Sequence, residues 1–277
     1  MDPSLRSGCK AKPMRIRSGD AEIEYEVLGS GPPVVLLHPF PAHHGIWMPV
    51  AQMLSTRYRC ILPDLRGHGK SQPGIGPATM TKHATDIERI CREEDLSKAV
   101  FAGISIGGYI LFELWRQHRE RFAGLILCNA RAQADTQEAR AARLQSAADV
   151  EKHGPGEFVE KNVERLVGAT TRRNRPDLAN AARAMMADMT VAGIVAVQQG
   201  MAERPDSVET LKTIDAPTLI VAGDEDQVSS LADSELIHHS IRGSRLEVIP
   251  QAGHYAAFEQ PAAIARVMRQ FLGRLNY

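Results

Sequence analysis

The chain has 277 residues, of which 43% are hydrophobic, and its 33 Lys and Arg residues balance its 33 Asp and Glu residues. This length and apolar content suffice for one large folded domain. The charge balance and the shortness of the one basic cluster, residues 172–175, argue against a nucleic-acid partner. No apolar run approaches the roughly 18 residues of a membrane span.

The N-terminal residues 1–12 predict a disordered leader, because they are polar and lack the apolar core of a signal peptide. The four cysteines, at positions 9, 60, 91 and 128, do not have metal-ligand spacing. Cys60 and Cys128 fall in apolar, strand-like runs. A reduced, cytoplasmic setting is the simplest expectation.

Alternating strand and helix patterns run along most of the chain. Residues 14–28 alternate like an antiparallel hairpin, and strands are expected near 34, 59, 99, 124, 219 and 246, with helices near 47, 83, 108, 230 and 262. This order predicts an α/β fold, a mostly parallel twisted sheet of about eight strands with helices on both faces. Residues 13–131 and 214–277 would form this core domain.

The segment 132–213 lacks a convincing strand and is rich in Ala, Arg, Glu and Met. Breaks at 154–156 and 175–176 divide it into several helices. Because α/β sites lie at the carboxyl ends of the strands, we expect a helical cap inserted over the active site. Four methionines, 185, 186, 189 and 201, would serve either as an adaptable wall for a ligand or as ordinary cap core.

A turn with a conspicuous pattern follows the strand-like residues 58–61. It reads Leu-Pro-Asp-Leu-Arg-Gly-His-Gly-Lys-Ser over 62–71. Asp64 and Arg66 can form a hydrogen-bonded ion pair across this glycine-rich turn, so we expect it to have a structural role.

The residues 103–107, Gly-Ile-Ser-Ile-Gly, lie between an apolar strand and a helix-like stretch. This context is typical of a serine exposed on a sharp strand-to-helix turn, and Ser105 is the candidate nucleophile. The alternative is a glycine-rich turn whose serine caps the next helix. A serine nucleophile needs a base, and His254 lies on a loop after a strand, where it can point into a cleft.

The base in turn needs a carboxylate on its other nitrogen. The buried-strand pattern 218–222 ends in Gly-Asp-Glu-Asp, so Asp224, Glu225 and Asp226 are all candidates. The chain order is then serine, acid, histidine, which is the order found in α/β-hydrolases.

With these motifs the chain resembles the α/β-hydrolase superfamily over nearly its whole length. Within the Gly-x-x-Asp segment the resemblance points to Asp226, and residues 253–261 resemble the family's Gly-His-x-x-x-x-Glu-x-Pro segment. The resemblance is greatest to the carboxylesterase, enol-lactonase and cofactor-free haloperoxidase-like branch, which carries serine at the turn. It implies that neither a cofactor nor a metal is needed.

An oxyanion also needs fixed donors. One is expected to be the backbone N–H of Ile106, directly after the serine. In related hydrolases the second donor follows a His-Gly pair, and here the loop reads His38-Pro39-Phe40-Pro41. Because proline has no N–H, Phe40 is the expected donor, and His38 is expected to brace the loop.

The sequence therefore predicts a serine hydrolase that cleaves a small carboxylic ester or lactone through an acyl-enzyme. A carbon-carbon bond hydrolase, a perhydrolase or an acyltransferase would use the same triad. A non-catalytic ligand receptor of the same fold is the more distant alternative. The expected partner is a small molecule, without nucleic acid or membrane, and homo-oligomerisation stays open.

Overall fold

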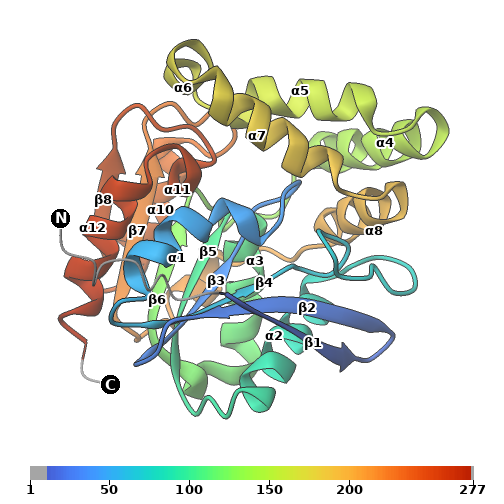
Figure 1. Cartoon of the computed structure of the whole chain (residues 1–277). Coiled ribbons are helices and arrows are strands. Elements are labelled where there is room, and N and C mark those ends of the chain that lie inside the picture. The colour runs from blue at the N-terminus through green and yellow to red at the C-terminus, as the bar shows by residue number, and fades with distance from the viewer. Residues whose placement is uncertain (1–10, 276–277) are drawn as a thin grey trace, which may run out of the picture.

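The computed structural model describes residues 11–275, and these form an eight-stranded sheet covered by helices (Figure 1). The predicted leader lies almost wholly outside the described residues, and the first strand begins at Lys12. The strands are β1 (Lys12–Ser18), β2 (Ala21–Leu28), β3 (Pro33–Leu37), β4 (Arg59–Pro63), β5 (Ala99–Ile104), β6 (Phe122–Cys128), β7 (Thr218–Gly223) and β8 (Arg245–Ile249).

The strand order across the sheet is β1-β2-β4-β3-β5-β6-β7-β8. The β1/β2 and β2/β4 pairs are antiparallel, and every other pair is parallel. Every residue of β5 and β7 is buried, as expected for strands covered on both faces, whereas β1 at the edge has exposed residues. The predicted fold class is confirmed.

Helices cover both faces of the sheet (Figure 1). One group packs together as α1 (Met48–Leu54), α11 (Ala256–Glu259) and α12 (Pro261–Leu272). The other group consists of α2 (Met80–Glu93), α3 (Ile106–His118), α9 (Val208–Leu211) and α10 (Leu231–Ser240). Two short 3₁₀ helices cover His44–Ile46 and Arg119–Arg121.

The segment between β6 and β7 is helical. Its cap helices are α4 (Gln137–His153), α5 (Gly156–Leu166), α6 (Ala169–Asn174), α7 (Pro176–Ala187) and α8 (Val191–Ala202). Figure 1 shows α4 to α7 as a layer above the core.

The boundaries of the cap helices follow their local chemistry. The Thr136 and Thr190 side chains cap α4 and α8. Gly154, with a φ of 80°, ends α4, and Pro176 opens α7, where its missing N–H costs no hydrogen bond. Within residues 11–275, no helix is long and apolar enough to cross a membrane.

Candidate active site

A sharp turn joins β5 to α3, and Ser105 occupies it with φ of 54° and ψ of −115°. A positive φ is uncommon for a residue with a Cβ and often marks a functional site. A Cβ on Gly103 would lie 2.4 Å from the carbonyl carbon of Gly107, and one on Gly107 would lie 2.6 Å from the carbonyl oxygen of Leu37. The two glycines therefore let the turn pack tightly against the end of β3.

His254 lies on the loop after β8, and its Nδ1 is 2.8 Å from Oδ2 of Asp226. Both side chains are only 1% exposed. Burial disfavours the charged form of Asp226, but the neighbouring His254 and hydrogen bonds from Ser229 and Val228 outweigh it and lower the pKa of the carboxyl group. Asp226 is therefore held as a carboxylate beside the imidazole.

The second ring nitrogen of His254 is free. Its Nε2 is buried and has no hydrogen-bond partner among residues 11–275. Ser105 and His254 line the same cavity. The structure thus brings Ser105 and His254 to one site and places Asp226 on the other side of the imidazole ring.

The two other acids of the predicted loop have different neighbours. Asp224 accepts a hydrogen bond from the Ala252 N–H at 3.3 Å. Glu225 accepts one from the Thr170 N–H at 2.8 Å and another from the Thr170 hydroxyl. Of the three acids, only Asp226 contacts His254, and Glu225 connects the core to the cap.

Asn129, which the sequence reasoning missed, joins the loops that carry the acid and the histidine. Its Oδ1 accepts from the Gly223 N–H at 2.8 Å, and its Nδ2 donates to the carbonyl oxygens of Gly253 and His254, both at 3.0 Å. The residue is buried directly after β6. The sequence could have indicated this role, because Asn129 is a polar residue at the carboxyl end of a buried strand, where functional residues often lie.

Glu259 links the histidine loop to the cap. Its two carboxylate oxygens accept hydrogen bonds from the N–H groups of Gly168, at 2.9 Å, and Gly253, at 3.1 Å. The His254 N–H donates to the Leu166 carbonyl at 2.9 Å. The connection between α5 and α6 therefore helps to position His254, a role that the sequence motif alone did not reveal.

The loop after β3 is held by His38. Its Nδ1 lies 2.9 Å from the carbonyl oxygen of Pro39, and its Nε2 accepts from the Leu65 N–H at 2.9 Å. Burial keeps the pKa of His38 well below its ordinary value, so the ring is neutral and has one donor and one acceptor nitrogen. His38 therefore connects the loop after β3 to the turn after β4, as expected.

The two predicted oxyanion donors flank the serine. Phe40 lines the cavity with Ser105, and Ile106 is the first residue of α3. Among residues 11–275, neither backbone N–H donates to another backbone group outside the regular elements. The Tyr255 hydroxyl donates to the Pro41 carbonyl at 3.3 Å and so ties the Phe40 loop to the histidine loop.

The predicted ion pair between Asp64 and Arg66 is wrong. Asp64 Oδ1 lies 2.7 Å from His44 Nδ1, while Arg66 pairs with Asp86 at 2.7 Å and with Asp20 at 2.6 Å. The turn directs the two side chains to different neighbours, one toward the loop after β3 and the other toward α2 and the β1/β2 turn. Both remain structural contacts.

One cluster in the described part of the chain has metal-ligand residue types. The potential ligand atoms of His43, His44 and Asp64 lie within 4.8 Å of one another. The Asp64 carboxylate already accepts hydrogen bonds from the His44 ring and from the backbone N–H groups of His44 and Lys70. These bonds account for the cluster without an ion.

The cavity has a volume of about 270 Å³, with walls from both the core and the cap. Phe158, Leu166, Met201 and Val228 contribute to its apolar part. Its polar residues, apart from the candidate triad, are Arg131, Asp135, Arg143, Ser146, Asn162, Arg165 and Gln198. Of the four methionines singled out in the sequence, Met201 reaches the cavity, and the other three are buried in the cap.

A second cavity of about 880 Å³ adjoins the first along α4 and α5. Ala142, Ser146, Phe158, Asn162 and Arg165 line both cavities. The remaining lining of the second cavity is largely polar and charged, comprising Gln145, Asp149, Val150, His153, Gly154, Gly156, Glu157 and Lys161.

The mostly parallel sheet and the serine on its strand-to-helix turn are features of one family of folds, to which a comparison with known families also assigns this chain. Residues 32–261 match the model of the alpha/beta hydrolase fold, and the chain belongs to that family.

Individual relatives cover nearly all of the chain. A thermophilic esterase from Thermogutta terrifontis, solved with malate bound, is 37% identical, with a TM-score of 0.92 over 95% of this chain and 99% of the other. The 3-oxoadipate enol-lactonase 1 of Acinetobacter baylyi is 29% identical, over 88% of this chain and 89% of its own length. An enol-lactonase from Burkholderia xenovorans, 22% identical with a TM-score of 0.88 over 94% and 100% of the two chains, shares the fold.

Proposed function

We propose that the protein is a serine hydrolase that cleaves a small carboxylic ester or lactone with Ser105, His254 and Asp226. The protein is an ester-hydrolysing enzyme, a conclusion that the similarity to an esterase and an enol-lactonase supports. The observation that carries the finer proposal is the state of His254. Its Nδ1 lies beside the Asp226 carboxylate, and its Nε2 is buried without a hydrogen-bond partner among the described residues, at the cavity that Ser105 lines.

Acylation begins at Ser105. Its Oγ attacks the carbonyl carbon of the substrate while the Nε2 of His254 takes the hydroxyl proton. Asp226 keeps the other proton on Nδ1 and stabilises the imidazolium. The N–H groups of Ile106 and Phe40 stabilise the oxyanion, and the leaving alcohol takes the proton from His254 as the ester C–O bond breaks.

Deacylation reverses the roles. His254 removes a proton from water, the hydroxide attacks the acyl carbon, and the returning proton restores the Ser105 hydroxyl as the acid leaves. For a lactone the leaving alcohol stays attached to the acyl group, so a single hydroxy acid is released. No step in this cycle requires an organic cofactor or a metal.

A serine-directed phosphonate tests the nucleophile. We expect intact mass to show one adduct on the wild type and none on Ser105→Ala, which should fold normally and keep less than about a tenth of the p-nitrophenyl acetate hydrolysis, since loss of a triad serine costs several orders of magnitude. Ser146→Ala changes a second serine of the same cavity and should keep both labelling and activity. A labelled, active Ser105→Ala would contradict the assignment.

The same assay separates the alternatives. A ligand receptor would neither be labelled nor turn over esters, whereas a perhydrolase or acyltransferase would be labelled and would prefer peroxide or an alcohol over water as the acceptor. A carbon-carbon bond hydrolase would be labelled but would favour ketone substrates. We also infer a cytoplasmic setting, supported by the buried free thiols of Cys60, Cys91 and Cys128.

A further inference from the structure

Arginine side chains dominate the charge of the active-site cavity. Arg131, Arg143 and Arg165 line it, and Asp135 is the one carboxylate side chain in its lining. The triad carboxylate of Asp226 lies behind the imidazole of His254, with its side chain only 1% exposed. The cavity therefore presents an excess of positive charge to whatever enters it.

Two of the three guanidinium groups are already paired. Nε of Arg131 lies 3.2 Å from Oδ2 of Asp233. Nε of Arg143 lies 2.9 Å from Oδ2 of Asp135, and the guanidinium also donates to Gln198 at 3.1 Å. These two arginines have local partners that limit their freedom to bind a ligand.

Asp135 pairs with a second arginine, and this partner is Arg204 rather than Arg165. Its Oδ1 lies 2.7 Å from Nη1 of Arg204, a buried residue whose guanidinium also stacks 4.4 Å above the Tyr109 ring. One carboxylate is thus shared between Arg143 and Arg204.

Arg165 is the charged group of the cavity without a partner. Within residues 11–275, its guanidinium makes neither a side-chain hydrogen bond nor an ion pair. It stands near the C-terminal end of α5, where the residue is exposed to solvent and lines both cavities. Partial burial and the positive charges of Arg143 and Arg131 lower its pKa, despite the opposite effect of Asp226 and Tyr109. An arriving anion would relieve this repulsion.

We propose that Arg165 binds a carboxylate on the substrate, so that the natural substrates are small esters or lactones that carry a free carboxylate besides the bond to be cleaved. The proposal rests on the hydrolase function proposed above and specifies its substrate class. A guanidinium presents two parallel N–H groups to a carboxylate, which orients the ligand as well as attracting it.

The geometry of the cavity fits such a bifunctional ligand. Ser105 and His254 lie on the core side, and Arg165 belongs to the cap side of the same 270 Å³ space. Phe158 and Leu166, from the same helix as Arg165, supply apolar surface for a short linker. The volume limits the ligand to a compact molecule.

A matched pair of methyl esters tests the proposal. Methyl hydrogen succinate carries a carboxylate where methyl levulinate carries an uncharged methyl ketone of nearly the same shape. We expect the wild type to hydrolyse the succinate half-ester with the higher kcat/KM. Arg165→Gln should lower kcat/KM for the half-ester by about 10- to 100-fold, the range expected for a charge-assisted hydrogen bond, and change methyl levulinate by less than about 3-fold.

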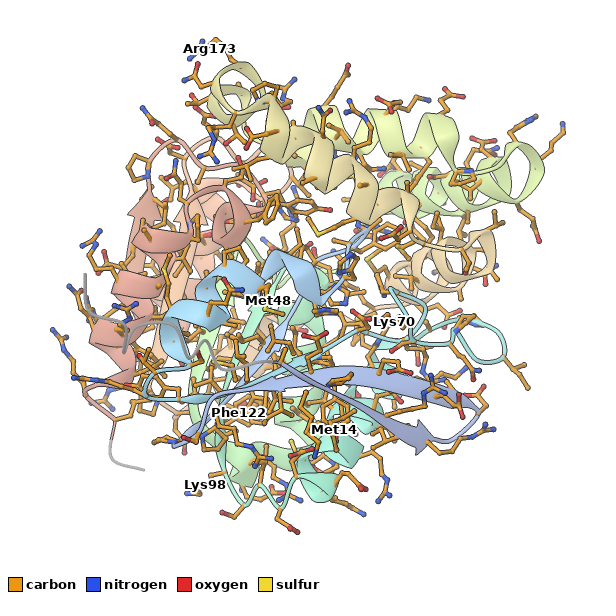
Figure 2. The ribbon with its side chains drawn as sticks, in the orientation of Figure 1. Met14, Met48, Lys70, Lys98, Phe122 and Arg173 are labelled. Carbon is orange, nitrogen blue, oxygen red and sulfur yellow. The ribbon has the colours of Figure 1, made fainter. Side chains whose placement is uncertain are left out.

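Two further variants exclude a general effect of charge or of stability. Arg165→Lys keeps the charge but not the paired N–H groups, so it should keep part of the preference. Arg173→Gln removes a cap arginine at the outer end of α6, labelled at the periphery of the molecule in Figure 2, and should leave the preference unchanged. A wild type that hydrolyses both esters without preference for the half-ester, or an Arg165→Gln variant that retains the preference, would overturn the proposal.

Binding measurements separate this proposal from the hydrolase function. Calorimetry with succinate on the Ser105→Ala protein should detect binding, and the Ser105→Ala/Arg165→Gln protein should bind at least about 10-fold more weakly. If the wild type is not labelled by the phosphonate and hydrolyses neither p-nitrophenyl acetate nor the two methyl esters, while this difference in binding is present, the triad proposal fails and the Arg165 site stands. If both esters are hydrolysed and the difference is absent, the Arg165 site fails alone.

Discussion

At the scale of single residues, Asp226 and its two acidic neighbours show how geometry selects among chemically equal groups. Asp224, Glu225 and Asp226 follow one another after β7, yet their partners are a backbone N–H, a threonine of the cap and the His254 ring. The choice depends on where the chain directs each side chain after the strand. Asp226 points toward the loop that follows β8.

This selection leads to a prediction about two matched variants. Asp226→Asn should lower kcat by several orders of magnitude, because an amide can donate to Nδ1 and stabilise the wrong tautomer, and it also removes the charge that offsets the imidazolium. Asp224→Asn, two residues away, should keep most of the activity. The measurement is kcat for p-nitrophenyl acetate at neutral pH. A larger loss for Asp224→Asn would mean that the acid has been misplaced.

At the scale of elements, the cap helices both position and enclose the site. The α5–α6 connection contacts the histidine loop through Leu166 and Gly168, while Phe158 and Arg165 from α5 line the cavity. The cap is therefore joined by hydrogen bonds to the loop that carries His254, and the cavity lies between the cap and the core. The adjoining second cavity offers further space, but its walls carry Asp149, Glu157 and Lys161.

The small volume of the cavity beside Ser105 predicts a limit on acyl-chain length. Neutral p-nitrophenyl esters from acetate to palmitate should give the highest kcat/KM with short or medium chains, because methylenes beyond the 270 Å³ cavity must stay in water or lie against charged side chains. Each unaccommodated methylene can cost about 1–3 kcal/mol in transition-state binding. The series is measured below the critical micelle concentrations. A maximum at palmitate would require an open acyl channel instead.

At the scale of the whole molecule, three histidines are buried side by side beneath the Phe40 loop. His38, His68 and His83 are each 0% exposed, and the ring centroids of successive members are 4.8 and 6.5 Å apart. Burial lowers the pKa of all three, that of His68 to about 4. All three are therefore neutral in the folded protein at pH 7.

The buried histidines predict a loss of stability in mild acid. The unfolded chain takes up protons on these rings near their ordinary pKa of about 6.5, whereas burial lowers the pKa of all three rings in the folded protein, that of His68 to about 4. Their contribution to the free energy of unfolding is complete above about pH 6.5 and is lost as the pH falls below this value, by up to about 1.4 kcal/mol per pH unit and per group.

His83→Leu isolates one of these rings, because both of its nitrogens are buried without partners in the described structure. In urea titrations at several pH values, this variant should lose its stability less steeply than the wild type below pH 6. Identical slopes for the two proteins would contradict the prediction, since the other titrating groups are common to both.

The sequence by itself determined the alternation of strands and helices and the helical segment between β6 and β7, and it supplied Ser105 and His254 as the candidate nucleophile and base. These depend on local patterns, namely the apolar strand runs, the glycines around Ser105 and the glycine and proline breaks in the cap, whose physical causes act within a few residues. Asp226 was predicted from the resemblance to the family's Gly-x-x-Asp segment. Phe40 was predicted from the family's loop after the first parallel strand, because Pro39 and Pro41 have no N–H to donate. Local patterns of this kind therefore predict the secondary structure and the fold class.

Only the tertiary structure decided which distant groups meet. The partners of Asp64 and Arg66, and the hydrogen bonds by which Asn129 joins the loops after β7 and β8, depend on contacts between segments tens of residues apart or more. The same holds for the absence of an ion-pair partner for Arg165 within residues 11–275. Hydrogen bonds and ion pairs of this range follow from how the strand ends and cap helices pack, and side-chain type alone does not specify them. The electrostatic character of the cavity therefore arises from packing, which pairs Asp135 with Arg143 and Arg204 and brings no carboxylate of residues 11–275 into an ion pair with Arg165.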